Sequence, residues 1–429
     1  MTPEQIQALD SRHIWHPFAQ AETGPALPVA VRGQGAWVET ADGHRVLDLV
    51  SSWWVNLHGH GEPSIAAAIA RQAAELEQVI FADFTHAPAA SLAAGLAKAL
   101  PDDLNRVFFS DDGSTAVEVA LKMALQYFPL VGQPGRTKLL GFERGYHGDT
   151  VGAMAVGHSS GYFRAWSGLL FPVDTICFPA TWGGDDSVEA KEEKALAELD
   201  AKLDDQVAAV ILEPLIQGAG GMRMCRPQFL RAVAERVRQS GALLILDEVM
   251  TGFGRTGQLF ACIKAGIVPD LICLSKGLTG GFLPMGATVA RDGFCQAFVG
   301  QTLDRAFLHG HSYTANPLGC AAGLASLALL TGDESTMRRR DLEAVQIERV
   351  TALAARRPDL HARACGTIAA IDLAAGSYGD GSGQEIKQKF WEAGMLIRPL
   401  GPVLYFLPPY CVASEELHKA WDLLESLLD

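Results

Sequence analysis

The sequence lacks the features typical of membrane-bound, secreted and nucleic-acid-binding proteins. No segment approaches the run of about 18 apolar residues that a membrane-spanning helix needs, and the first residues, MTPEQIQALD, show no basic stretch followed by an apolar one. Positive charge is scarce, since the formal net charge is −14. Such a chain disfavours nucleic acids and anionic membranes as partners. We therefore expect a cytoplasmic protein that acts on small molecules.

Paired cysteines and metal-ligand patterns are also missing. The eight cysteines are scattered without a CxxC pair, and several lie inside apolar runs such as 271–274. We expect reduced structural thiols. His58 and His60, like His309 and His311, have no acidic or cysteine partner at ligand spacing, so no metal site is predicted. The pattern GxxxxGK[ST] does not occur, which leaves a nucleoside-triphosphate site without support.

What the chain does have is length and apolar content. It contains 429 residues, of which 48% are hydrophobic and 20% charged. This composition is typical of a folded protein with a substantial core, and the length predicts a large domain with a smaller one beside it.

Short apolar runs alternate with amphipathic stretches through the middle of the chain. This alternation predicts an α/β fold, in which a mostly parallel sheet is connected by crossover helices. Helices are predicted at 116–127 and 227–240, where apolar residues recur at spacings of three and four. The predicted strands are 106–110, 138–142, 208–212, 242–246, 271–274 and 285–290.

The pattern changes near both ends of the chain. Beyond 332 the alternation stops, and a helical segment leads into strand-like runs at 367–373 and 396–407. Near the start, AWVETADGHRVLD contains two strand-like runs broken by Asp42-Gly43, which predicts a hairpin packed beside the C-terminal part. We predict an N-terminal segment at 1–60, a large domain at 61–332 and a small α+β domain at 333–429.

Two opposite charges follow predicted strands: Asp247 ends ALLILD, and Lys276 ends LICLSK. In an open parallel sheet, ligands bind outside the carboxyl ends of the strands, so both groups are expected at one crevice. A pyridoxal-5'-phosphate (PLP) enzyme needs this pair, because a lysine forms an imine with the cofactor and a carboxylate keeps its pyridine nitrogen protonated. The alternative is that both are ordinary surface charges at strand ends.

A third strand, RVFFS, leads through Asp111-Asp112 into Gly113 and Ser114 at the start of a helix. Backbone N–H groups and a hydroxyl at a helix N-terminus form a suitable phosphate site, although an ordinary helix cap would have the same sequence. Tyr146, in GYHGDT, is a candidate to lie flat against a cofactor ring, whereas simple packing is the commoner role of a single tyrosine.

With these residues assembled, the chain resembles the class III aminotransferases of PLP fold-type I over nearly its whole length. The general family pattern is carried by LILDEVMTGFGRTG at 244–257 and LSKGLTGGFLPMGA at 274–287. Six further blocks resemble the biotin-pathway branch of the family: HIWHPF, SSWWVNLHGH, DDGSTAVEVALKMALQY, GYHGDT, HGHSYTANPLGC and IRPLGPVLYFLPPY.

The resemblance implies a role for each matching residue. Lys276 would hold PLP, Asp247 would pair with the pyridine nitrogen, and Tyr146 would stack on the ring. The implied phosphate ligands are Gly113 and Ser114, with Gly310 and Ser312 from the partner subunit of a homodimer. The implied substrate-pocket residues are Phe18, Trp53, Trp54, Asp149, Tyr405 and Arg398, the last for a carboxylate. Glu213 matches an acidic position near the active site.

The chain departs from the branch pattern at two positions. Phe18 stands where tyrosine is frequent, which removes one hydroxyl that could touch substrate, and Ser312 stands where threonine is frequent, which keeps the hydroxyl. The branch implies amination of 7-keto-8-aminopelargonate, with S-adenosylmethionine as amino donor. The sequence leaves open another class III aminotransferase acting on acetylornithine, 4-aminobutyrate or a diamine, a PLP aminomutase, and a noncatalytic binding module.

Overall fold

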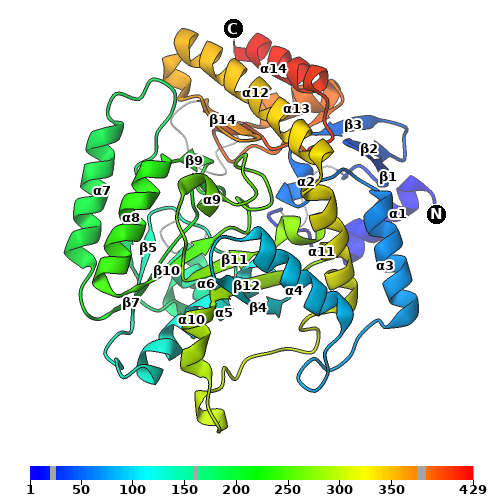
Figure 1. Ribbon diagram of the computed structural model, residues 1–429. Helices are drawn as coiled ribbons and strands as arrows, with labels where there is room; N and C mark the ends of the chain where they lie inside the picture. Colours follow the sequence, from blue (N-terminus) through cyan, green and yellow to red (C-terminus); the bar gives the residue numbers. More distant parts are fainter. Residues whose placement is uncertain (20–25, 158–162, 374–382, 429) are drawn as a thin grey trace.

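A seven-stranded sheet forms the centre of the molecule (Figure 1), in the order β4-β12-β11-β10-β7-β5-β6. The computed structural model describes residues 1–19, 26–157, 163–373 and 383–428. β12 is antiparallel to both neighbours, and the other adjacent strands are parallel. The strands are β4 (Leu104–Ser110), β5 (Lys138–Phe142), β6 (Asp174–Ile176), β7 (Val207–Leu212), β10 (Leu243–Asp247), β11 (Leu271–Leu274) and β12 (Gly286–Arg291). The predicted α/β class and the six predicted strands are confirmed, whereas β6 was not predicted because it is only three residues long.

Helices cover both faces of this sheet. Successive side chains of a strand point to opposite faces, and in β10 Ile245 packs in the cluster that contains α5 residues, while Leu244 and Leu246 pack in the cluster that contains α8 residues. α8 confirms the prediction at 227–240. The helices that cover or border the sheet are α4 (Ala87–Ala99), α5 (Gly113–Leu130), α6 (Val151–Val156), α7 (Val188–Lys202), α8 (Pro227–Ser240), α9 (Ala261–Ala265), α10 (Asp292–Cys295) and α11 (Pro317–Leu330).

α8 shows how the sequence sets these boundaries. Pro227 occupies the first turn, where its missing N–H costs nothing, and Gly241 ends the helix with a φ of 75°. Between them four large apolar residues, Phe229, Leu230, Val233 and Val237, are buried. Their spacing places one apolar face of the helix against the sheet.

The N-terminal hairpin packs beside the C-terminal part, as predicted. β2 (Trp37–Thr40) and β3 (Arg45–Asp48) are antiparallel, and β3 pairs in parallel with β15 (Met395–Leu396). The remaining strands are β1 (Ala30–Gln34), β8 (Ile216–Gln217), β9 (Arg223–Met224), β13 (Arg363–Cys365), β14 (Ile368–Asp372) and β16 (Val403–Phe406). The remaining helices are α1 (Pro3–His13), α2 (Ser51–Trp54), α3 (Pro63–Glu75), α12 (Asp333–Arg356), α13 (Gln384–Glu392) and α14 (Ser414–Leu428). Two segments distant in sequence thus share one small sheet.

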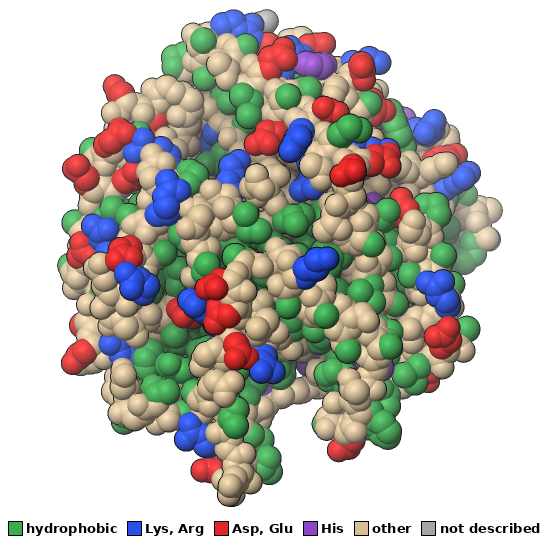
Figure 2. Space-filling view, viewed as in Figure 1, with side chains coloured by type: hydrophobic (Ala, Val, Ile, Leu, Met, Phe, Trp, Pro, Cys, Tyr) green, Lys and Arg blue, Asp and Glu red, His purple; other side chains and the backbone are tan. Residues whose placement is uncertain are grey.

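On the face drawn in Figure 2, Lys and Arg side chains are interspersed with Asp and Glu and do not gather into one patch. Within the described residues, no helix combines the length and the apolar character that crossing a membrane requires. All eight cysteines lie in described segments, and each is a free thiol, as predicted.

Candidate active site

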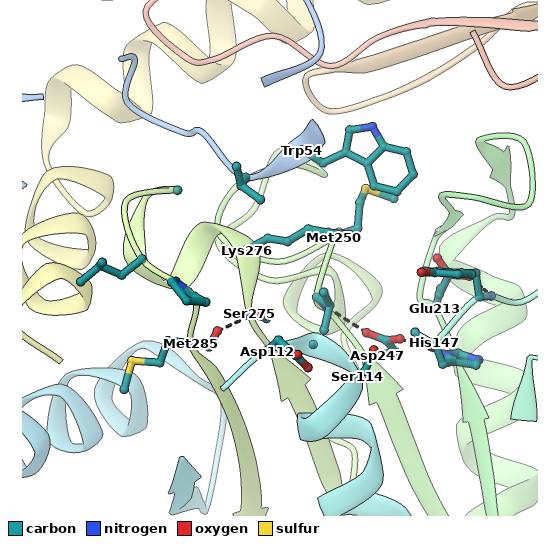
Figure 3. Close-up of a pocket in the computed structure, with 18 of the residues that line it drawn as sticks. Trp54, Asp112, Ser114, His147, Glu213, Asp247, Met250, Ser275, Lys276 and Met285 are labelled. Atoms are coloured by element: carbon teal, nitrogen blue, oxygen red, sulfur yellow. Dashed lines mark hydrogen bonds and ion pairs between the residues drawn. The ribbon is translucent and has the colours of Figure 1, made fainter. Parts of the chain in front are cut away.

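A cavity of about 490 Å³ opens at the carboxyl ends of β10 and β11. Its volume falls in the range of small-molecule sites, about 300–1,000 Å³. Some of the residues that line the cavity were predicted from the sequence, and others were not (Figure 3). The predicted residues in the lining are Trp54, Gly113, Ser114, Tyr146, Glu213, Asp247 and Lys276.

Lys276 lines this cavity, two residues beyond the end of β11. Its Nζ lies 4.6 Å from the centre of the Trp54 ring, and its backbone φ is 41°, a left-handed value. Burial lowers the pKa of Lys276 to about 8, and the nearby charges of Asp247 and Glu213 only partly oppose this. About a tenth of the amine is therefore neutral at pH 7, far more than in an ordinary lysine, and the neutral form is the one that a nucleophile or proton carrier requires.

Asp247 ends β10 on the opposite side of Lys276 from Trp54 (Figure 3). Its carboxylate is 4% exposed, accepts the Val249 N–H at 3.0 Å, and accepts from His147 Nδ1 at 2.7 Å. Burial by itself would lower the pKa of His147, but the hydrogen bond and charge of Asp247 outweigh it and raise that pKa. His147 Nε2 has no hydrogen-bond partner among the described residues. The pair places a buried negative charge, oriented by an imidazole, at the floor of the cavity.

Glu213 adds a second buried carboxyl group beyond β7. It accepts the Tyr146 N–H at 3.0 Å and the Gly218 N–H at 2.8 Å. Burial raises the pKa of Glu213 to about 7, against the opposing effect of His147. The first of these contacts holds the Tyr146 backbone beside the cavity, and the Tyr146 hydroxyl donates to Asp149 Oδ1 at 3.1 Å.

The N-terminus of α5 forms one wall. Asp112 caps this helix by accepting the Thr115 N–H at 2.8 Å, so the N–H groups of Gly113 and Ser114 lie in the first turn, before any intrahelical acceptor. A Cβ added at Gly113 would lie 2.7 Å from Val249, and one added at Gly148 would lie 1.9 Å from the Ser114 hydroxyl. Only glycine at these positions leaves the helix end open to a ligand.

Three further aromatic side chains and one arginine lie near Trp54, outside the residues that line the cavity. Trp54 Nε1 donates to the Tyr405 hydroxyl at 2.9 Å, and the two rings pack edge to face. Trp53 is 38% exposed, and Arg398 Cζ lies 4.5 Å from its ring centre. Within the described part of the chain, no carboxylate forms an ion pair with Arg398. The rings of Phe18 and Trp53 pack edge to face, with their centres 5.6 Å apart.

Seven predicted residues do not line this cavity: Phe18, Trp53, Asp149, Arg398, Tyr405, Gly310 and Ser312. Gly310 and Ser312 are exposed on the segment between β12 and α11, and neither lines the cavity of its own chain. The Ser312 carbonyl instead accepts from Gln78 Nε2. In a single chain, the predicted phosphate site therefore contains Gly113 and Ser114 of α5 but not Gly310 or Ser312.

Several lining residues were not predicted from the sequence. His147 directly follows Tyr146 in the GYHGDT block, so its position carried a usable signal. Val249 and Met250 follow Asp247 closely, and the segment 281–285 closes one side. These apolar positions carry no chemical signal, because only the fold shows that they face a cavity and not the core.

Comparison with known proteins identifies the family. The family model described as aminotransferase class III matches residues 18–428. The adenosylmethionine-8-amino-7-oxononanoate aminotransferase of Synechococcus elongatus is 53% identical over 97% of this chain and 98% of its own. The chain belongs to the class III aminotransferases, and it is therefore a PLP-dependent transferase of amino groups.

Solved structures agree with this assignment. The adenosylmethionine-8-amino-7-oxononanoate aminotransferase of Methanocaldococcus jannaschii superposes with a TM-score of 0.90 at 32% identity, covering 99% of this chain and 98% of the other. An amine transaminase from an uncultivated Pseudomonas species, in its PLP-bound form, has a TM-score of 0.89 at 31% identity, covering 97% and 98%. The fold and the cofactor class are thus those of PLP-dependent transaminases.

The cavity fits PLP in its dimensions and its chemistry. It offers an amine with a pKa of about 8 in Lys276, a 4%-exposed carboxylate in Asp247, and an open helix N-terminus at Gly113 and Ser114. These are the groups that an aldehyde, a pyridine nitrogen and a phosphate would need. The side-chain and backbone groups of this one site therefore match all three functional ends of the cofactor.

Proposed function

We propose that this aminotransferase converts 7-keto-8-aminopelargonate, also named 8-amino-7-oxononanoate, to 7,8-diaminopelargonate in biotin biosynthesis, with S-adenosylmethionine as the amino donor. The single observation that carries the proposal is the 53% identity, over nearly both full lengths, to a relative whose name states that activity. A cytoplasmic location accompanies this proposal, since both substrates are small soluble metabolites.

Each residue of the cofactor end has a defined task in this proposal. PLP supplies an aldehyde that bonds to amines and an electron-poor ring that accepts the electron pair released at carbon. Lys276 would hold the cofactor and then carry a proton from the donor carbon to the C4' carbon of the cofactor, and in the second half of the cycle it would carry a proton from C4' to the acceptor carbon. Asp247 keeps the pyridine nitrogen protonated, and His147 orients Asp247 through their 2.7 Å hydrogen bond. Gly113 and Ser114 bind the phosphate, and Tyr146 packs on the ring.

The substrate end binds the organic parts of both substrates. Arg398 takes a carboxylate, because its guanidinium has no acidic partner within the described residues and is held over Trp53. Trp53 and Trp54 supply aromatic surface for the apolar chain of the acceptor and for the sulfonium of the donor. The other residues proposed to line the substrate pocket are Phe18, Asp149 and Tyr405.

We further propose a homodimer in which Gly310 and Ser312 of each chain complete the phosphate site of the partner. Exposed apolar side chains surround this segment, including Leu303 at 72%, Leu308 at 73% and Tyr313 at 60%. Apolar side chains that are this exposed and this close together favour a protein–protein contact. The dimer would bury them and bring the two hydroxyl-bearing segments to the partner cavities.

Mixed dimers test this arrangement. Ser312→Asp places a negative charge beside the phosphate of the partner cavity, and Lys276→Ala inactivates its own cavity. A hybrid of the two chains contains one cavity with both residues native, so mixing the inactive parents should restore up to about a quarter of native activity if exchange is random. No gain over the parents after subunit exchange would contradict the shared site.

A two-stage assay tests the function itself. The PLP form of the enzyme is mixed with S-adenosylmethionine, lysine or another amine, and the loss of the cofactor's absorbance band identifies the donor. 7-Keto-8-aminopelargonate is then added, and 7,8-diaminopelargonate is measured by mass spectrometry. We expect S-adenosylmethionine to react and diaminopelargonate to form.

The same assay separates the competing activities. Acetylornithine, 4-aminobutyrate and a diamine, each offered as donor in place of S-adenosylmethionine, identify another class III aminotransferase. An aminomutase would convert one substrate with no external donor. Absence of any spectral change with every amine would contradict an aminotransferase activity and favour a noncatalytic protein.

A further inference from the structure

The two tryptophans of the substrate end lie on a backbone segment of unusual conformation. Ser51, Ser52, Trp53 and Trp54 have φ values of 49°, 50°, 80° and 73°. These four residues form a left-handed turn. Residues other than glycine rarely adopt the left-handed conformation, even one at a time. None of the four is glycine, so the surrounding structure must hold the turn in place.

The side chain of Asp48 supplies much of that support. Asp48 is 0% exposed, and its Oδ1 accepts the Val50 N–H at 3.0 Å. Its Oδ2 accepts from the Ser52 hydroxyl at 3.1 Å and from His60 Nε2 at 3.0 Å. One buried carboxylate therefore binds the residue before the turn, a residue within it, and a residue beyond it.

The backbone of Asp48 also aligns the strand that leads to Arg398. Asp48 is paired with Leu396 in the parallel β3–β15 pair, and the Leu49 N–H donates to the Leu396 carbonyl at 3.1 Å. Arg398 follows Leu396 by two residues. Asp48 thus supports both the segment that carries Trp53 and the strand that leads to Arg398. The Arg398 guanidinium carbon lies 4.5 Å from the centre of the Trp53 ring.

The far side of the turn is fixed by other contacts. The Ser51 hydroxyl donates to the Leu407 carbonyl at 2.8 Å, and the Trp54 indole donates to Tyr405 at 2.9 Å. Arg255, 1% exposed, donates to the Asn56 carbonyl at 3.0 Å and the Pro408 carbonyl at 2.8 Å. Because this side has its own support, loss of Asp48 is expected to shift Trp53 more than Trp54.

We propose that Asp48 is a positioning residue for the substrate carboxylate: it holds the left-handed turn so that Trp53 keeps Arg398 in the orientation that binds a carboxylate. Asp48 itself touches neither substrate nor cofactor in this proposal. The inference rests on the proposed function only in taking Arg398 as the carboxylate ligand. It predicts weaker substrate binding with an intact cofactor site.

The test uses nonanoate, a nine-carbon carboxylate, as a probe that needs no turnover. Its Kd for the PLP-loaded enzyme is measured by calorimetry, alongside the KM for 7-keto-8-aminopelargonate and the melting temperature. In Asp48→Asn, an amide oxygen cannot accept from all three donors, and we expect Kd and KM to rise about tenfold with the cofactor spectrum unchanged.

A second substitution separates turn geometry from general stability. Glycine adopts a φ near +50° without strain, so adding Ser52→Gly to Asp48→Asn should restore most of the nonanoate affinity. Asp270→Asn is the matched control, because Asp270 accepts the Leu244 N–H at 2.8 Å at the opposite end of the strands. It should lower the melting temperature and leave the Kd unchanged.

Each outcome decides the proposal. A native Kd in Asp48→Asn, or no recovery on adding Ser52→Gly, would overturn it. If Asp48→Asn does not fold, Ser52→Ala removes one donor to Asp48, and an unchanged Kd there would overturn it equally. Wild-type enzyme that binds nonanoate but does not aminate 7-keto-8-aminopelargonate would refute the proposed function alone, whereas wild-type enzyme that binds no nonanoate would refute the role of Asp48.

Discussion

The two ends of the active site are built in different ways. The cofactor end consists of residues at the carboxyl ends of neighbouring strands, such as Asp247 after β10 and Lys276 after β11, held by the regular hydrogen bonds of the central sheet. The substrate end joins an N-terminal turn to the C-terminal part of the chain, and the residues of its Trp54–Tyr405 hydrogen bond lie 351 positions apart.

This difference suits the cofactor end to catalysis and the substrate end to substrate selection. A sheet that is buried on both faces positions its strand ends with little freedom, which suits groups that must meet the reacting atoms closely. A turn and a loop held by a few side-chain contacts can change without disturbing the sheet. We therefore expect substitutions at the cofactor end to reduce kcat and those at the substrate end to raise KM.

The largest effect is expected for Lys276→Ala. Turnover should fall by about 10⁴-fold or more, because no other side chain in the cavity can both bond the cofactor and carry the proton. Steady-state assays at saturating substrate measure the loss, and circular dichroism checks the fold. Lys419→Ala, an exposed lysine on α14, is the control and should keep native activity. Native turnover in Lys276→Ala would refute the assignment of the cofactor end.

Asp247→Asn should have the next largest effect. A neutral amide cannot hold the proton on the pyridine nitrogen, and it also loses the charge that raises the pKa of His147. We expect kcat to fall about 10²- to 10³-fold while bound PLP stays near one per chain. Absorbance of the dialysed enzyme measures cofactor content. A variant that keeps native kcat would show that another group protonates the ring.

Arg398→Lys tests the substrate end. Charge-assisted hydrogen bonds from a guanidinium to a carboxylate contribute about 1.5–3 kcal/mol to the binding free energy, whereas a surface ion pair contributes about 0–1 kcal/mol. We expect about a 10- to 100-fold rise in KM with kcat changed much less, since ammonium cannot reproduce two parallel hydrogen bonds.

Measuring both half-reactions of Arg398→Lys locates the carboxylate that it binds. A defect larger with the amino-acid donor would assign Arg398 chiefly to the α-carboxylate of that donor. A defect larger with 7-keto-8-aminopelargonate would assign it to the distal carboxylate. Unchanged kinetics in both would remove Arg398 from the site.

The smallest effect is the pH dependence of cofactor uptake. The pKa of Lys276 falls from an ordinary 10.5 to about 8, so its reactive neutral form increases as pH rises through about 8 and is nearly complete at about 9. The rate at which apoenzyme takes up PLP should therefore rise about fivefold from pH 7 to pH 8 and then level off. Stopped-flow absorbance measures it. A rate that keeps rising towards pH 10.5 would show that the cavity does not lower the pKa of Lys276.

The central sheet and its strand-end charges could be read from the sequence because they depend on local patterns. Buried parallel strands appear as short apolar runs, and a polar residue that ends such a run marks the ligand edge of the sheet. β5 and β11 were predicted with their observed bounds. β6 was missed because three residues carry too little periodicity to be recognised.

The sequence alone determined the α/β class and the mostly parallel sheet, and it predicted Asp247 and Lys276 at the ligand edge of that sheet, because these features follow from short-range periodicity. Only the tertiary structure decided that His147 bonds to Asp247, that Asp48 supports a left-handed turn, and that Trp53 lies against Arg398. The first and third of these contacts join residues far apart in the chain, and the second joins Asp48 to a turn only a few residues away. No local pattern specifies them, since they depend on how separate segments pack, and a turn with four positive φ values is contrary to the local preferences of its own residues.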